Sequence, residues 1–466
     1  MTYLVRFFLW IIITSVSVAQ SAASLFNHQS FTLANGLKVF ILPNHLSPLI
    51  HVGLYYKVGT ADDAPEEHGL SHFLEHMMFK GTEMIPRGML DTLLLQQGVA
   101  YNAHTTPDYT CYEATFAKNQ LELILFLEAD RMTHLNFTRA DIESERKVVF
   151  EERAMRLDNH PFGKVIEIYL RSLYWKHPYG IPAIGYPENI AHYSFESVRK
   201  HYETYYTPNN AILIIAGDTN SATVKPLVEK YFGPIPFKKV PERLRPKEPS
   251  HEGTVIRIEH TDARNHAIVL QYSYHAPSAV SEGKRHALPL ILLTQILSGN
   301  ELSRLWQKFV NQEKIAVNID FSYDPWSIDP ETLDIIMTLN EGVTKKYAEK
   351  RLEEEIQLLL KKGVTPEELA HAKRDILASL AFIKDGLEST VQMFSRVVFG
   401  VPEEDIEHFD QRIEAVTLEQ VNEAIHDVFD KKPEVILTLL PKGYDLSKED
   451  TPPLAQSLWN ALRSIF

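Results

Sequence analysis

The sequence predicts an α+β fold with two similar domains, each a largely antiparallel sheet with helices packed on one face. Alternating apolar segments and helix-periodic segments follow one another in both halves of the 466-residue chain. The order of these segments in the first half recurs loosely in the second. Between the halves, residues 233–252 are rich in proline and charge and lack any period, which is typical of an interdomain linker.

The composition is that of a globular protein. Hydrophobic residues make up 44% and charged residues 23%, so wholesale disorder is excluded. The formal charge is 47 − 61 = −14, and with no basic run this argues against nucleic acid as the main partner. Cys111 is the only cysteine, which excludes an intrachain disulfide and a cysteine-rich zinc module.

The first 23 residues are expected to be a secretory signal peptide. Arg6 precedes the apolar run 7–13, and Ser17-Val18-Ala19 is a plausible cleavage site, with Ala23 as a second choice. An uncleaved anchor is the alternative, but the apolar run is shorter than the ~20 residues that span a bilayer. We expect export to the bacterial periplasm without stable membrane insertion, with a mature charge of 46 − 61 = −15.

The first half begins with a predicted hairpin, because Asn35-Gly36 separates two alternating apolar segments. The elements expected after it, in chain order, are a strand over 51–58, helices over 69–80 and around 93–97, a strand over 110–117, helices over 119–134, 139–158 and 195–206, and a strand over 211–216.

The second half is expected to repeat the first. Thr138 and Thr365 each precede an acidic helix, at an offset of 365 − 138 = 227. We predict an N-terminal domain over 24–232, a C-terminal domain over 253–446, and a tail or helix over 447–466. Duplications of this kind usually enclose a cavity between the halves.

The sharpest motif is His-x-x-Glu-His, formed by His72, Glu75 and His76 within GLSHFLEHMMFKGT. On a helix these three side chains share one face. Two imidazoles one turn apart can bind one zinc ion, and the carboxylate beside them can take a proton from a water that zinc activates. Burying such groups among apolar neighbours would be costly without a metal or polar partners.

Zinc needs a third protein ligand, and the helix predicted over 139–158 offers two. Glu145 and Glu152 are seven residues apart and share a face, so either could bind zinc while the other orients a histidine N–H. Glu143 and Glu151 should point elsewhere, and a merely solvated acidic face is the alternative. Apolar packing is expected from Ile142, Val148, Val149 and Met155.

With these residues in view, the chain resembles the pitrilysin-like zinc peptidases, or inverzincins. Within that family it looks most like the mitochondrial processing peptidase catalytic subunit and its bacterial periplasmic relatives. The resemblance spans roughly residues 30–445 and includes GLSHFLEHMMFKGT at 69–82, NAHTTPDYTCY at 102–112, ERKVVFEE at 145–152, HPYGIPAIG at 177–185 and YTPNNAILIIAGD at 206–218.

The resemblance implies a zinc metalloendopeptidase with one Zn²⁺ per chain that acts on short or unfolded polypeptides. It implies that His72, His76 and Glu152 bind the metal and that Glu75 is the general base. Glu145 matches the carboxylate that holds a ligand histidine from behind.

Three further residues match substrate-binding positions of the family. Asn102 and Ala103 match the edge strand that pairs with the substrate backbone. Phe79 matches an aromatic residue of the pocket beyond the scissile bond, although plain core packing would explain it equally well.

The second half lacks the metal set. With the offset of 227, Glu145 falls on Ala372 and Glu152 on Ser379, and residues 290–300 contain no histidine. We therefore expect one active site per chain.

One departure from the family concerns an Arg and a Tyr seven residues apart after a Ser-Arg-Leu stretch. Ser303-Arg304-Leu305 is present here, but the two positions are Val310 and Val317. We therefore predict that a homologous zinc-free subunit, or a second copy in a homodimer, supplies the pair.

Two other functions fit parts of the pattern. A non-catalytic chaperone-like or assembly subunit on the same fold is the main alternative. A small-molecule hydrolase with the same metal set is a second, against which the motif at 102–112 and the duplicated chain argue.

Overall fold

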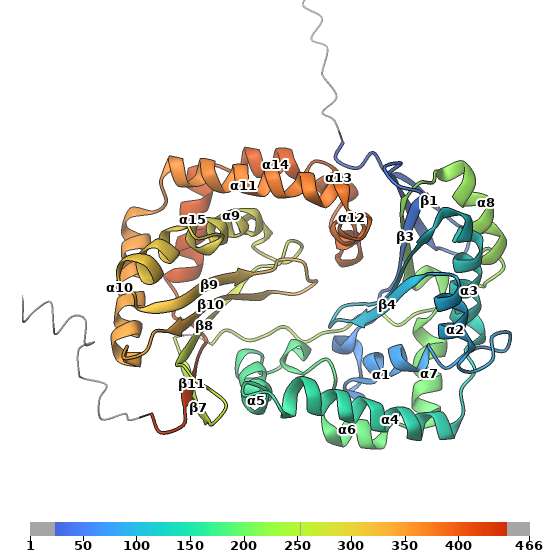
Figure 1. The fold of residues 1–466 in the computed structure, drawn as a ribbon, viewed down its shortest axis with the longest axis horizontal. Helices are drawn as coiled ribbons and strands as arrows, with labels where there is room; N and C mark the ends of the chain where they lie inside the picture. The colour runs from blue at the N-terminus through green and yellow to red at the C-terminus, as the bar shows by residue number, and fades with distance from the viewer. Residues whose placement is uncertain (1–23, 252, 445–466) are drawn as a thin grey trace, which may run out of the picture.

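The computed structural model describes residues 24–251 and 253–444. Figure 1 shows one sheet in each half, with the segment after α8 running from one half to the other. The predicted signal peptide and the predicted tail over 447–466 lie outside the described residues, and the domain boundaries stay predictions. No helix in the described part of the chain is both long enough and apolar enough to cross a membrane.

The sheet of the first half has six strands in the described residues, in the order β1-β2-β6-β3-β5-β4. β2 and β6 run parallel, and the other neighbours are antiparallel. β1 and β2 form the predicted hairpin around Asn35-Gly36, which confirms it. The strands are β1 Gln29–Thr32, β2 Lys38–Pro43, β3 Leu49–Tyr56, β4 Ala100–Thr105, β5 Thr110–Ala117 and β6 Ala211–Gly217.

The sheet of the second half repeats this topology without a counterpart of β1. Within the described residues its order is β7-β11-β8-β10-β9, and the single parallel pair, β7 and β11, takes the place of β2 and β6. The predicted α+β fold with two similar, largely antiparallel sheets is therefore confirmed. The strands are β7 Ile256–Asp262, β8 Val269–Ala276, β9 Ala316–Tyr323, β10 Glu331–Leu339 and β11 Val435–Pro441.

The helices predicted in the first half are all present, two of them with changes, but the helices over 163–173, 187–192 and 221–231 were not predicted. The predicted helix over 69–80 is shorter, and the one over 139–158 changes to a π-helical turn after Arg153. The helices are α1 Leu70–Met77, α2 Met89–Gln96, α3 Leu121–His134, α4 Arg139–Arg153, α5 Gly163–Leu173, α6 Pro187–His192, α7 Phe195–Tyr205 and α8 Ser221–Tyr231.

Helix caps show the duplication most clearly. Thr138 caps α4 and Thr365 caps α11, each in a reciprocal capping box with the acidic residue three positions on. The two starts keep the offset of 227 seen in the sequence. The helices of the second half are α9 Ala287–Ser298, α10 Lys345–Lys362, α11 Pro366–Asp385, α12 Leu387–Phe394, α13 Glu403–Glu407, α14 Phe409–Ala415 and α15 Leu418–Phe429.

The two faces of the first sheet have different partners. One face, with Leu54 and Leu213, packs against the helices that include α1, where Phe73 is fully buried. The other face carries Phe40 and Tyr55, which pack with Phe394 of α12 in the core of the second half. Apolar burial therefore joins the two halves through α12.

The linker is also fixed by buried ion pairs. The Arg245 side chain is only 6% exposed and pairs with Asp62 at 2.9 Å, Asp108 at 2.5 Å and Asp329 at 3.0 Å. Asp62 and Asp108 belong to the first half, and Asp329 lies two residues before β10 in the second. The guanidinium thus neutralises carboxylates from both halves at once.

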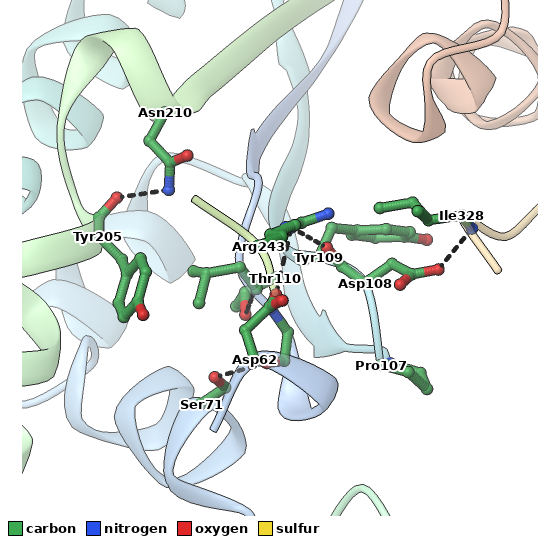
Figure 2. A network of polar contacts seen from close by, with 12 residues as sticks. Asp62, Ser71, Pro107, Asp108, Tyr109, Thr110, Tyr205, Asn210, Arg243 and Ile328 are labelled. Atoms are coloured by element: carbon green, nitrogen blue, oxygen red, sulfur yellow. Dashed lines mark hydrogen bonds and ion pairs between the residues drawn. The ribbon is translucent and has the colours of Figure 1, made fainter. Parts of the chain in front are cut away.

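A second linker arginine extends this network (Figure 2). Arg243 pairs with Asp62 at 3.3 Å and donates to the Asp108 carbonyl at 2.6 Å. The Asp108 carboxylate accepts from the backbone N–H of Ile328 at 3.0 Å, which connects the turn between β4 and β5 to the second half. The linker therefore holds this turn in place.

The residues before β1 form another contact between the halves. The Glu407 carboxylate of α13 accepts backbone N–H groups of Phe26 at 2.8 Å and His28 at 3.0 Å. The His28 ring also contacts Glu407 at 2.5 Å and Glu403 at 2.9 Å. These carboxylates hold the pKa of His28 above its usual value despite its partial burial.

Replacing the central linker arginine tests the ion-pair network. Arg245→Ala leaves buried carboxylates without their cation, so we expect the free energy of unfolding to fall by about 3 to 5 kcal/mol. Arg139→Ala is the control, since its pair with Glu196 is 73% and 63% exposed and should contribute about 0 to 1 kcal/mol. Urea denaturation measures both, and equal small losses would contradict a stabilising role for the network.

Candidate zinc site

Helix α1 starts in a tightly fixed position. Gly69 has a φ of 91°, and a Cβ there would lie 2.7 Å from the backbone of Ile184 and Gly185. The Asp63 carboxylate accepts from the Gly69 N–H at 2.8 Å and the Ser71 hydroxyl at 2.7 Å. Only glycine tolerates this close approach with a positive φ, so the end of the motif HPYGIPAIG locks the start of the helix.

The structure brings His72, His76 and Glu152 together. Oε2 of Glu152 lies 3.6 Å from Nε2 of His72 and 3.1 Å from Nε2 of His76. The two imidazole centroids are 4.8 Å apart. All three donor atoms lie within 4.8 Å of one another, as a shared metal ion requires.

The donor set fits zinc. Around a tetrahedral zinc, ligand atoms are about 3.3 to 3.8 Å apart, given bond lengths of about 2.0 to 2.3 Å. Oε2 of Glu152 is buried and has no hydrogen-bond partner among the described residues, although His76 is close. The short distances therefore reflect atoms that face a common point, where a cation would satisfy all three.

The electrostatics of these side chains point the same way. Burial favours the neutral form of Glu152, but the two histidines outweigh it and hold its pKa well below the usual range. Burial lowers the pKa of His76, yet Glu145 and Glu152 raise it to about 9. The ionised carboxylate is thus a ready ligand, and metal binding would displace a proton from His76.

Glu145 contacts the metal set from behind. Its Oε1 lies 2.9 Å from Nδ1 of His76, and its other oxygen pairs with Lys80. Burial would raise the pKa of Glu145, but these two partners lower it. A charged carboxylate at Nδ1 holds the ring so that Nε2 faces Glu152.

Glu75 lies on the same helix outside the ligand trio. Its carboxylate accepts a hydrogen bond from the Thr105 hydroxyl of β4 at 2.6 Å. Sequence reasoning missed three residues of the site: Thr105, Lys80 and Arg156. The Arg156 side chain contacts Glu152 at 2.9 Å. Arg156 stands four positions after its partner Glu152, a spacing that could have indicated it; Lys80, whose partner Glu145 lies on another helix, and Thr105 had no such signal.

The predicted substrate residues lie where a peptide could reach them. Asn102 and Ala103 belong to β4, an edge strand whose only strand neighbour in the described part of the chain is β5. Phe79 is half-buried, with its ring 5.0 Å from that of Tyr101. Phe79 therefore packs at the margin of the hydrophobic core of the first half.

The second half has no such site in its described residues. Over residues 24–251 and 253–444, potential metal-binding trios occur only in the first half. Ala372 and Ser379 both lie on α11, the counterpart of α4. Val310 packs half-buried in a π-helical turn, and Val317 is 52% exposed on β9.

One expectation about α4 was wrong. Ile142 and Val149 are buried as predicted, but Val148 is 44% exposed and Met155 71% exposed. Val148 lies on the solvent side of the helix, and the π-helical turn after Arg153 changes the direction of the residues that follow. The predicted apolar packing therefore fails at Val148, within the helix, and at Met155, in the π-helical turn after it.

Comparisons of the sequence find one family in both halves. Residues 38–185 match the family described as Insulinase (Peptidase family M16), and residues 192–376 match its Peptidase M16 inactive domain. The zinc protease PqqE of Helicobacter pylori is 29% identical to this chain. The match covers 77% of this chain and 81% of the Helicobacter pylori protein. A Bacillus subtilis protein named uncharacterized zinc protease YmxG is 27% identical, and the match covers 86% of this chain and 95% of that protein.

Solved structures share the fold. A protease from Helicobacter pylori superposes with a TM-score of 0.82 at 26% identity, covering 89% of this chain and 99% of that one. Pitrilysin superposes with a TM-score of 0.71 at 19% identity, covering 89% of this chain and 45% of that longer chain. The likeness to pitrilysin is one of fold.

Glu145→Gln tests the support behind His76. A neutral amide accepts the imidazole N–H more weakly than a carboxylate and loses the pair with Lys80. We expect zinc affinity to fall about 10- to 100-fold with the three ligands intact, measured by competition with a chelator. Glu143→Gln, on the exposed side of the same helix, is the control, and matching affinities in the two variants would count against this role.

Proposed function

The chain belongs to the peptidase M16 family, and on that premise we propose that it is a zinc-dependent metalloendopeptidase. It would hydrolyse peptide bonds in short or unfolded polypeptides. The observation that carries the proposal is the approach of Nε2 of His72 and His76 to the unpartnered oxygen of Glu152, with Glu75 on the same helix.

The chemistry follows from the positions of these side chains. When bound, zinc would act as a Lewis acid that activates water and polarises the scissile carbonyl. His72, His76 and Glu152 would hold it, and a set of three protein ligands is typical of catalytic zinc sites. Glu75 accepts the proton of the attacking water and returns it to the leaving amine. The Thr105 hydroxyl holds the Glu75 carboxylate in position through its 2.6 Å hydrogen bond.

The substrate would bind in an extended form along β4. Its backbone adds a strand at the edge that carries Asn102 and Ala103, which gives affinity with little sequence preference. Thr105 belongs to the same strand, so a peptide paired there lies close to Glu75. A net acidic protein favours basic over acidic peptides.

We also propose that the active assembly contains a second subunit. The Arg/Tyr pair of related enzymes is replaced by Val310 and Val317, so a homologous zinc-free chain, or a second copy, would supply it. The periplasm would be the site of action, given the signal-like segment before residue 24.

Glu75→Gln tests the general base. The amide cannot accept a proton, so peptide hydrolysis should fall by a factor of about 10² to 10⁴ or more, measured with a quenched fluorescent peptide. Bound zinc, measured by elemental analysis, should stay at the wild-type level because Glu75 is no ligand.

Two outcomes would contradict the assignment. Loss of zinc in Glu75→Gln would make Glu75 a ligand. No turnover of any peptide by the zinc-loaded wild-type assembly would favour the non-catalytic subunit instead. Glu151→Gln, exposed on α4, is the matched control and should leave both activity and zinc content unchanged.

The partner prediction concerns the isolated chain. Zinc-loaded monomer should cleave peptides slowly, and addition of the zinc-free partner should raise the rate, because the Arg/Tyr pair then reaches the substrate. Rates measured across a concentration series, with oligomeric state followed by light scattering, check this. Full activity of the monomer alone would show that no second subunit is needed.

A further inference from the structure

A cavity of about 690 Å³ lies between helix α5 of the first half and the sheet of the second half. Figure 1 shows α5 beside that sheet, where it contacts β7 and β11. Ligand pockets commonly have volumes of about 300 to 1,000 Å³, so the cavity is large enough to hold a ligand. None of the residues assigned above to zinc or substrate lines it.

The walls of the cavity are mainly apolar. Phe162, Ile166 and Leu170, on or directly before α5, line one side, and each is half-buried. Val269 of β8 and Ile336 of β10 line the other side and are also half-buried. A ligand that covers these side chains removes their apolar surface from water and supplies the contacts that they lack. The walls therefore favour an apolar occupant.

One carboxylate of the cavity already has hydrogen-bond donors. Asp334 accepts from the Tyr169 hydroxyl at 3.1 Å and from the Gln271 side-chain amide at 3.1 Å. Its other oxygen accepts from the Thr332 hydroxyl at 2.8 Å. Hydrogen bonds to an ionised carboxylate are strong ones, so Asp334 is stabilised without a bound cation.

Glu331 is the second carboxyl group of the cavity. Burial raises its pKa to about 8, and the negative charges of Asp108 and Asp324 act in the same direction. Near neutral pH this group is therefore mostly protonated and attracts a cation less than an ionised carboxylate would. The polar end of the cavity thus offers hydrogen-bonding groups more than free negative charge.

The cavity adjoins the strand to which we assign the substrate. Pro107 lines it and follows by two positions Thr105, the residue of β4 that contacts Glu75. Two residues of chain span at most about 7 Å. Ala183 also lines the cavity, two positions before Gly185, which packs against the start of α1. An extended peptide that pairs with β4 and continues past Thr105 would reach the cavity within about two or three residues.

We propose that this cavity is a substrate subsite that takes a large apolar side chain, preferably an aromatic one, about two or three residues from the scissile bond. The inference rests on the proposed function. Phe162, Tyr169 and Tyr174 place aromatic rings in the walls, and contacts between rings add to the gain from burying apolar area. The subsite adds a side-chain preference to backbone pairing along β4, which by itself discriminates little between sequences.

Matched peptides test the subsite. Quenched fluorescent peptides share one scissile bond, confirmed by mass spectrometry, and carry Phe, Lys or Ala at a single position two to four residues to either side of it. The zinc-loaded wild-type assembly cleaves them. We expect kcat/KM for Phe to exceed that for Ala at least about tenfold at one position, because the ring is buried there. Lys should be no better than Ala at that position.

Two variants connect the preference to the cavity. Ile336→Phe would occupy part of the space, and Ile166→Ala would remove part of one wall. Each should lower the ratio of the Phe rate to the Ala rate about fourfold or more. Ile168→Ala is the matched control, since Ile168 lies on the same helix, is 58% exposed and does not line the cavity. Its ratio should equal that of the wild type, and circular dichroism checks the fold of each variant.

Equal rates for Phe and Ala at every position would overturn the proposal, as would a preference for Lys at the position nearest the cavity. An unchanged ratio in both folded variants would do the same. Failure of the proposed peptidase differs from these results, because no peptide would then be cleaved. In that case, fluorescence anisotropy measures binding of the Phe and Ala peptides to Glu75→Gln, and equal affinities would overturn the subsite.

Discussion

The contact between α1 and α4 is the constraint on which the candidate zinc site depends. The helices lie side by side, so Glu145 and Glu152, two turns apart, both reach His76. The Glu145 carboxylate contacts Nδ1 of the His76 ring, and the Glu152 carboxylate contacts Nε2 of the same ring. The packing of Gly69 against Gly185 fixes where α1 begins. A shift of α1 by one residue would rotate both histidines away from Glu152.

The two halves share their architecture, but only the first half carries the metal-binding side chains among the described residues. Apart from β1, both halves keep the same strand order among their described residues, and both keep the same capped helix at an offset of 227. In the second half, Ala372 and Ser379 of α11 replace the carboxylates. The shared features are those that packing requires, because a sheet must cover its apolar face with helices whatever its function.

Sequence reasoning anticipated what depends on local patterns. Period-two alternation located β5 from end to end, and the His-x-x-Glu-His spacing identified side chains that the structure brings together. It failed where the outcome depends on distant contacts. The partners of Arg245 come from three separate segments, and Thr105 reaches Glu75 only through the pairing of β4 with β5. No single window of sequence contains that information.

The linker network has a consequence for the integrity of the molecule. Arg245 pairs with both halves, Glu407 holds the strand entry at Phe26, and α12 packs into the first sheet. The halves are therefore joined by buried side chains at several places, independently of the peptide bonds between α8 and Arg243. A chain cleaved in that stretch would remain one particle, and Arg243 and Arg245 would still bind Asp108 in the turn between β4 and β5.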